Sequence, residues 1–237
     1  MLGLGNSIIT PSDSKPIFAN IYSVDFDGAN DYLEVEDHNT LDFTAGFSIN
    51  FWVYPDASTG NDRMIAKGTT GTGEWMISFG SGAAIRVYTK DNNNNALDFT
   101  STNTLSTGAW AMVTVVINRT DSKIQVYKNG GNLNESSDAS WDAGWASSQA
   151  LRIGLNSGGS NEFEGQMSEA AIWNSELSST EVAELYGSGA PSFNLRYNRK
   201  NYTNASNLVG YWRMGDGAGD KHPTILDQSD NTNNATM

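Results

Sequence analysis

The sequence predicts an all-β fold: an antiparallel β-sandwich with one short helix at its rim. The clearest evidence is the strict alternation of side chains through residues 47–54. One face of this segment is apolar and consists of Phe47, Ile49, Phe51 and Val53, whereas the other consists of Ser48, Asn50, Trp52 and Tyr54. Because side chains of a strand point alternately to its two faces, the pattern is typical of a half-buried sandwich strand.

Short runs of the same kind recur along the chain, each bounded by Gly, Asn or Ser. We predict twelve strands, at residues 24–26, 32–35, 47–54, 63–67, 75–79, 85–89, 97–100, 110–118, 124–128, 151–155, 166–173 and 208–214. The loop 118–122 joins two of these strands, and Asn129 with Gly130 supplies residues that tolerate a tight turn. Short strands with such turns favour a sandwich.

Only one segment has a helical pattern. Ser178 and Glu181 have the spacing of a capping box, which satisfies free backbone N–H groups at the start of a helix. Val182 and Leu185 follow on one stripe, and Gly187 is a typical helix end. We therefore predict a short helix at the rim of the sandwich.

Composition narrows the class of protein. A chain of 237 residues suits one large β domain, and without cysteine it depends on packing rather than on disulfides for its stability. The 14 basic and 27 acidic residues give a net charge of -13, which disfavours nucleic acid and anionic membranes as partners. Neither a signal peptide nor a membrane span is recognisable, so we expect no membrane insertion.

Several segments together resemble the laminin G-like family of concanavalin A-like jelly-roll domains. They are residues 26–35, 47–55, 110–118, 126–130 and 165–174, with 177–186 behind the last of these. The resemblance covers residues 23–187 and implies a jelly-roll sandwich, but a shared fold says little about the ligand. It also implies a lectin-like role and, as in many members of the family, structural calcium.

The C-terminal region departs from the usual order of that family. Residues 211–219 and 227–236 look like the strand and turn that normally open such a domain, yet here they come last. We expect a single domain over residues 21–237, in which residues 188–237 form a C-terminal strap that returns a strand to its own sheet. The alternative is that the strap donates this strand to a neighbouring copy. Residues 1–20 are expected to form an N-terminal arm.

This arrangement is similar to laminin G-like modules in structural proteins of marine bacteriophages. The resemblance implies a virion protein, with an extracellular or cell-surface location as the alternative. The first hypothesis is a non-catalytic module that binds a glycan or polysaccharide on such a particle. The second is a capsid decoration or fibre protein that joins other virion proteins, or forms a homo-oligomer, by strand addition.

Exposed rings and amides are the candidate glycan-binding groups, because flat rings stack on sugars and amides bond to their hydroxyls. The candidate residues are Trp52, Tyr54, Asn93, Asn94, Trp141, Asp142 and Trp145. For the indoles of the loop 141–145, the alternative is that they fold inward and anchor the loop. Trp75 and Tyr88 present the same choice, and the amides of residues 92–95 are also explained by a solvated turn.

Oxygen-bearing side chains near the start of the domain suggest a calcium site. Asp25, Asp27, Asn30 and Asp31 surround a sharp turn, and Ca²⁺ takes about six to eight oxygen ligands. Their spacing does not match an EF-hand. Because the strand that carries Glu169 could return beside this turn, we predict Asp27, Asp31 and Glu169 as ligands. The alternative is that Asp27 and Asn30 simply cap the turn.

The sequence offers little for catalysis, and we expect a protein that is not an enzyme. His38 and His222 are the only histidines, and neither has a nucleophile and an orienting carboxylate in its sequence context. Glu34 and Glu36 alternate around Val35 at the end of a predicted strand, as the paired carboxylates of sandwich-type glycoside hydrolases do, but the alternation stops after two. A carbohydrate-active hydrolase is therefore the third hypothesis.

Overall fold

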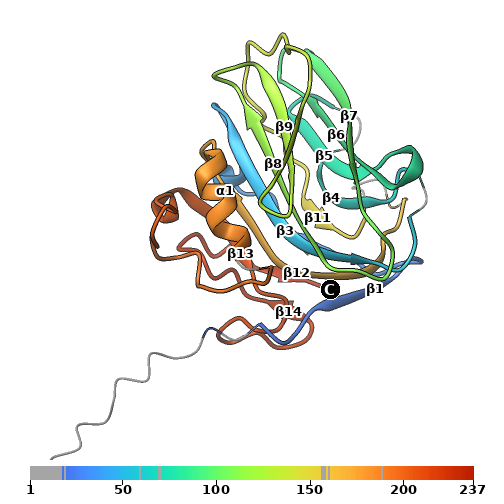
Figure 1. Cartoon of the computed structure of the whole chain (residues 1–237), viewed down its shortest axis with the longest axis vertical. Helices are drawn as coiled ribbons and strands as arrows, with labels where there is room; N and C mark the ends of the chain where they lie inside the picture. Colours follow the sequence, from blue (N-terminus) through green and yellow to red (C-terminus); the bar gives the residue numbers. More distant parts are fainter. Residues whose placement is uncertain are drawn as a thin grey trace, which may run out of the picture.

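Two antiparallel β-sheets lie face to face (Figure 1) in the computed structural model, which describes residues 18, 20–58, 60–68, 71–155, 159, 161–187 and 189–237. The predicted fold class, an antiparallel sandwich with one α-helix, is confirmed. The predicted arm at residues 1–20 lies outside the described residues, apart from Phe18 and Asn20.

The first sheet carries most of the candidate functional residues. In spatial order its strands are β1 (Val24–Asp27), β12 (Glu164–Trp173), β3 (Phe47–Pro55), β8 (Ala111–Asn118), β9 (Lys123–Lys128) and β10 (Gly131–Glu135). A further strand, β13 (Leu208–Trp212), pairs with the second half of β12. The first half of β12 pairs with β1, so β12 joins both ends of the chain to the sheet.

The second sheet is built mainly from the middle of the chain. In spatial order its strands are β14 (Thr224–Ile225), β15 (Ala235–Thr236), β2 (Leu33–Val35), β11 (Leu151–Ile153), β4 (Arg63–Lys67), β5 (Glu74–Phe79), β6 (Ala84–Lys90) and β7 (Ala96–Thr104). Three single-turn helices, η1 (Asn39–Leu41), η2 (Ser81–Ala83) and η3 (Ala205–Asn207), lie in the connections.

All twelve predicted strands are present, and the structure adds three that the pattern did not predict. Two of these, β14 and β15, have only two residues each, which is too short for any periodicity. The third, β10, has the polar sequence GNLNE and lies at the edge of the first sheet. Its pairing with β9 comes from the turn at Asn129 and Gly130 rather than from burial.

The alternation in β3 sets how the layers pack. Its apolar face is buried between the sheets, where Phe47 contacts Trp75 of β5. On the outer face of the same strand, Trp52 belongs to a second apolar cluster with residues of α1 (Ser179–Tyr186). Figure 1 shows α1 on this outer side of the first sheet. Strand β3 is therefore buried on both faces for most of its length.

The predicted capping box of α1 is present. The hydroxyl of Ser178 accepts from the backbone N–H of Glu181 at 3.3 Å, and the Glu181 carboxylate accepts from the backbone N–H of Ser178 at 3.0 Å. The second carboxylate oxygen of Glu181 accepts from the backbone N–H of Thr203 at 3.1 Å and from the amide of Asn204 at 2.6 Å. The box therefore also ties the helix to the strap.

Replacing Ser178 by alanine should lower the free energy of unfolding by about 1 kcal/mol, since one cap is lost from an otherwise intact helix. Urea unfolding followed by tryptophan fluorescence measures this change. Ser179→Ala, one position inside the helix and equally exposed, is the matched control and should leave stability nearly unchanged. Equal effects of the two substitutions would show that the cap contributes nothing.

Residues 188–237 add strands to both sheets of their own chain. In β13, Trp212 lies opposite Ala170 of β12, and in β15, Ala235 lies opposite Val35 of β2. The Trp212 ring is buried in the main core, and its indole nitrogen donates to the carbonyl of Asn233 at 2.7 Å. The strap is thus a built-in part of the sandwich, and its strands are paired without a second copy.

Candidate functional site

Four side chains form a row across the outer face of the first sheet, beyond the C-terminal end of α1. Asp25 of β1 lies opposite Gln166 of β12, and Gln166 lies opposite Tyr54 of β3. Trp110, which directly precedes β8, continues the row, with its ring centroid 5.7 Å from that of Tyr54. The row therefore combines a carboxylate, an amide and two aromatic rings on adjacent strands.

A surface hollow of about 350 Å³ lies beside this row, and we call it the aromatic hollow. It is lined by residues 20–23, Trp52, Trp110, Gln166, Ser168 and residues 189–191. Trp110 is 42% exposed and Tyr22 is 58% exposed, so two large rings face solvent at its edges. Pockets for small ligands typically combine apolar walls with a few polar groups, and this hollow has that composition.

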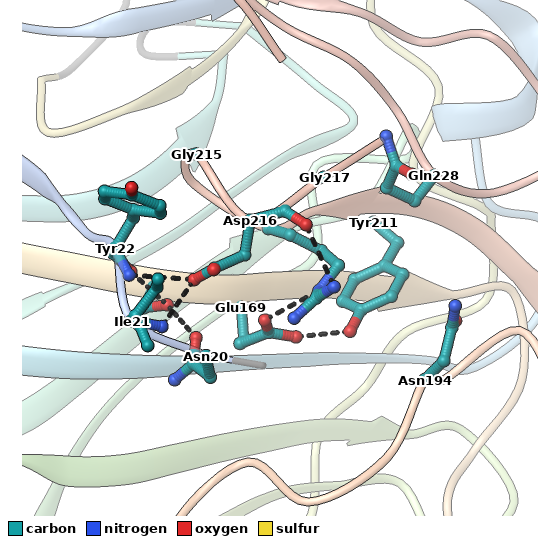
Figure 2. Close-up of polar contacts among 12 residues, drawn as sticks. Asn20, Ile21, Tyr22, Glu169, Asn194, Tyr211, Gly215, Asp216, Gly217 and Gln228 are labelled. Carbon is teal, nitrogen blue, oxygen red and sulfur yellow. Dashed lines mark hydrogen bonds and ion pairs between the residues drawn. The ribbon is translucent and has the colours of Figure 1, made fainter. Parts of the chain in front are cut away.

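One wall of the aromatic hollow is the segment 20–23, which the C-terminal strap holds in place. The carboxylate of Asp216 accepts from the backbone N–H groups of Ile21 and Tyr22, both at 2.8 Å (Figure 2). The hydroxyl of Ser168 on β12 donates to the side-chain oxygen of Asn20 at 3.0 Å. The wall is therefore fixed by hydrogen bonds from two directions.

Gln166 is the polar group best placed to bind a ligand in the row. Its side-chain oxygen accepts from the hydroxyl of Ser23 at 3.1 Å, which fixes the amide group. Within the described part of the chain, its side-chain nitrogen has no hydrogen-bond partner. An amide that is oriented by one bond and retains free donors can bond to a hydroxyl-rich ligand.

A buried charge network lies beneath this wall (Figure 2). Glu169 has a φ of 52° and lies at an irregularity in the pairing of β12 with β3, as expected of a β-bulge. Its carboxylate accepts from Nε of Arg213 at 2.9 Å and from the hydroxyl of Tyr211. Arg213 also donates through Nη1 to the backbone carbonyl of Asp216 at 3.0 Å. The network thus connects the centre of β12 to the residue that holds the wall.

Burial raises the pKa of the Glu169 carboxyl to about 7, although Arg213 and Tyr211 both act to lower it. The Tyr211 hydroxyl is also buried, and burial together with the nearby Glu169 charge raises its pKa well above the usual value. These shifts are consistent with a structural network shielded from water.

The predicted calcium ligands do not come together, so that ligand set is wrong. Asp27 of β1 pairs with Glu164, whereas Glu169 lies five positions further along β12 and bonds to Arg213. Asp27 instead accepts from the backbone N–H of Ala29 at 2.9 Å, as in the turn-capping alternative. Among the residues the structure describes, no three acidic or histidine side chains form a group that could hold a metal ion. Calcium binding itself stays a prediction without a ligand set.

The amide-rich tip and the loop 141–145 do come together, as a self-contained turn. Asn93 and Asn95 donate side-chain hydrogen bonds to Asp142 at 3.0 and 2.7 Å. The carboxylate of Asp91 accepts from the backbone of Asp142 at 2.9 Å, and its hydrogen bonds help to lower its pKa. Asn93, Asn94 and Asp142 are exposed, but the bonds of Asn93 and Asp142 hold the two loops together.

The structure buries three of the tryptophans that were predicted as sugar platforms. Trp145 is 0% exposed and Trp141 8%, and both pack into the main core, so the inward-facing alternative holds for this loop. Trp52 is 5% exposed and its ring stacks on Tyr186 of α1, with the ring centroids 5.7 Å apart, although Trp52 is also one of the residues that line the aromatic hollow. Trp75 also belongs to the core. Exposure of these rings was inferred from their positions in a strand and a loop. Large apolar rings are usually buried, and here they are.

Three of the residues considered for catalysis, Glu34, Glu36 and His38, line one surface hollow beside the second sheet. His38 caps η1 through its ring nitrogen, which accepts from the backbone of Thr40, and His222 is exposed. Glu34 forms an ion pair with Arg152 at 2.7 Å on the second sheet. Glu36, which directly follows β2, is exposed. This arrangement does not point to a reaction.

A sandwich of two antiparallel sheets with an aromatic surface hollow is the architecture of many lectin-like domains. Residues 27–183 match the family model of the concanavalin A-like lectin/glucanases superfamily, in its laminin G group. The chain therefore belongs to this superfamily, and the resemblance to the laminin G-like family inferred from the sequence is confirmed. No curated protein is a match by sequence. No helix among the described residues is long and apolar enough to cross a membrane.

Solved structures of similar fold include carbohydrate-binding modules. A Bacteroides ovatus protein described as carbohydrate-binding has 16% identity and a TM-score of 0.66, over 91% of this chain and 58% of its own. The CBM40 of a Ruminococcus gnavus sialidase, bound to α2,3 sialyllactose, has 9% identity and a TM-score of 0.57, over 72% of this chain and 100% of its own. Domain 4 of the arabinanase AbnA from Geobacillus stearothermophilus, in complex with arabinotriose, has 16% identity and a TM-score of 0.54, over 69% and 76%. At these identities the likeness shows the fold alone.

Proposed function

We propose that this chain is a non-catalytic glycan-binding domain, and that the aromatic hollow with its adjoining row is the binding surface. The observation that carries the proposal is the exposed ring of Trp110, which lies against Tyr54 and shares the hollow with Gln166. Rings of this kind stack on the apolar faces of sugars, and an amide reads hydroxyl groups. Modules of the same fold from glycan-degrading proteins support the proposal.

The row also suggests the shape of the ligand. It crosses β1, β12, β3 and β8, which are separated by three inter-strand spacings, or about 14 Å. A surface of this length accommodates a short oligosaccharide rather than a single sugar ring. Affinity should therefore rise with chain length over the first few units of the right glycan.

Binding to an immobilised glycan panel tests this proposal. Trp110→Ala should weaken binding to the preferred glycan at least about tenfold, equivalent to about 1.4 kcal/mol, because the stacked ring is lost. Gln166→Ala should also weaken binding. The control is Tyr32→Ala, which removes a half-buried ring from the second sheet, where it packs under the guanidinium of Arg152.

Unchanged affinity in a folded Trp110→Ala protein would contradict the proposed site, and a flat panel with folded wild-type protein would contradict the function. Strand addition between copies is the competing function. The structure pairs the three described strands of the strap, β13, β14 and β15, within the chain, so donating one of them to another copy would require the sandwich to open. We propose display on a virion or a cell surface as the setting, because glycans are reached there.

A further inference from the structure

Every side chain that lines the aromatic hollow within the described residues is uncharged. The lining consists of residues 20–23 and 189–191 with Trp52, Trp110, Gln166 and Ser168, and none of these is Asp, Glu, Lys or Arg. The polar groups at its surface are amides and hydroxyls, which donate and accept hydrogen bonds without a net charge. Such a lining suits hydroxyl groups rather than carboxylates or sulfates.

The charged side chains that flank the row on β1, β12 and the end of β3 are acidic. Asp25 stands in the row itself, and the next positions on the same face of β1 and β12 are Asp27 and Glu164, which lie opposite one another. Asp56 follows β3 there, with its backbone N–H bonded to the carbonyl of Glu164 at 3.1 Å. All four side chains are exposed. Hydrogen bonds from the backbone of Ala29 and Asn30 lower the pKa of Asp27, so its charge is retained.

The cation beneath the wall of the hollow is already engaged. The guanidinium of Arg213 bonds to Glu169 and to the carbonyl of Asp216, and it lies 4.1 Å from the ring centroid of Phe18. An anionic sugar in the hollow would thus lose water without gaining a cation from the residues that line it, and would also meet the field of the carboxylates on β1 and β12.

From this geometry we infer that the site takes uncharged oligosaccharides and rejects glycans that carry carboxylate or sulfate groups. The inference rests on the proposed function, since it assigns the ligand class of the same surface. Specificity here comes from an unfavourable interaction with the wrong ligand as much as from contacts with the right one.

The test uses a matched pair of probes. The best neutral polysaccharide of a glycan panel is compared with the same polysaccharide after its primary hydroxyls have been oxidised to carboxylates. In low salt, the oxidised form should bind at least about tenfold more weakly. Raising the ionic strength should narrow this difference, because the Debye length falls from about 30 Å at 0.01 M to about 3 Å at 1 M.

A variant that lacks the charge of Asp25 tests whether this carboxylate repels the oxidised glycan. Asp25→Asn should improve binding of the oxidised form in low salt more than it changes binding of the neutral form. Glu36→Gln removes one exposed carboxylate from the second sheet and is the charge-matched control, for which we expect no change in preference.

The possible outcomes distinguish failure of the proposed function from failure of the inference about ligand charge. If no neutral or acidic glycan binds to folded protein, the proposed function itself fails. If glycans bind and the oxidised form binds as well as the neutral form, the function stands and the inference is overturned. A difference that is insensitive to both salt and Asp25→Asn would likewise overturn the inference, because it would reflect the loss of a required primary hydroxyl.

Discussion

Replacing Trp145 by alanine is expected to lower the free energy of unfolding by about 3–5 kcal/mol, the cost of removing a large aromatic side chain from a packed core. The indole is completely buried and packs against Phe47 and Trp141, with ring centroids 5.4 and 5.2 Å away. Its nitrogen donates to the hydroxyl of Thr89 at 3.2 Å, so the truncation would also leave that hydroxyl without its donor.

Urea or thermal unfolding measures the loss, and two variants calibrate it. Trp145→Phe keeps most of the apolar volume and should cost less, and Trp110→Ala, at a position that is 42% exposed, should also cost less than Trp145→Ala. The unfolding free energies of the three variants together distinguish a core residue from a residue that binds sugar at the surface. A Trp145→Ala protein of normal stability that had lost glycan binding would contradict the assignment of Trp145 to the core.

The strands were predicted from the local alternation of apolar and polar residues, and this local pattern was sufficient to find them. Alternation in residues 47–54 fixes which side chains of β3 enter the core whatever the rest of the chain does. The loop 141–145 has no such period, and its direction depends on a contact with a distant segment. Trp145 forms an isolated bridge with Phe43, in which the two backbones exchange hydrogen bonds. Sequence spacing between residues 43 and 145 does not reveal that contact.

The candidate site could be predicted only in part, for a related reason. Tyr54 was identified from the polar face of β3. Gln166 and Trp110 could be recognised as its neighbours only once the strand order was known. Trp110 stands at the start of a predicted strand whose two faces are both largely apolar, so the local pattern does not show that its ring is exposed. The wall at residues 20–23 depends on Asp216, which is almost two hundred positions away.

Glu169 illustrates a different limit of sequence reasoning. Simple alternation along β12 would place residues 167 and 169 on the same, inward face. The bulge shifts the register between Ser168 and Ala171, and the positive φ of Glu169 turns its side chain toward Tyr211 and Arg213. A one-residue irregularity of this kind leaves no mark in the hydrophobic pattern. Glu169 does not reach the turn at Asp27 for a different reason, because it lies five positions along β12 from Glu164, which pairs with Asp27.

Replacing Glu169 by alanine should lower the free energy of unfolding by about 3–5 kcal/mol, because it leaves the largely buried guanidinium of Arg213 without its carboxylate. The Tyr211 hydroxyl would lose its partner as well. Glu169→Gln is the matched control, since its amide can accept from Arg213 and also bond to Tyr211. We expect the glutamine variant to fold with a much smaller loss.

Wild type and Glu169→Gln should also differ in how their free energy of unfolding depends on pH. A carboxyl whose pKa is about 7 in the folded state and near 4.5 when unfolded binds more protons folded than unfolded between these values. Stability contributed by Glu169 is therefore greatest below about pH 4.5 and falls as the pH rises toward 7, by about 1.4 kcal/mol for each unit of pKa difference. Because Glu169→Gln cannot ionise at this position, wild type should lose stability relative to that variant over this range. A stability difference between wild type and Glu169→Gln that is flat from pH 4 to about pH 8 would contradict a buried, pKa-shifted Glu169. An equal loss in Glu169→Ala and Glu169→Gln at every pH would show that the hydrogen bonds and shape kept by glutamine contribute nothing.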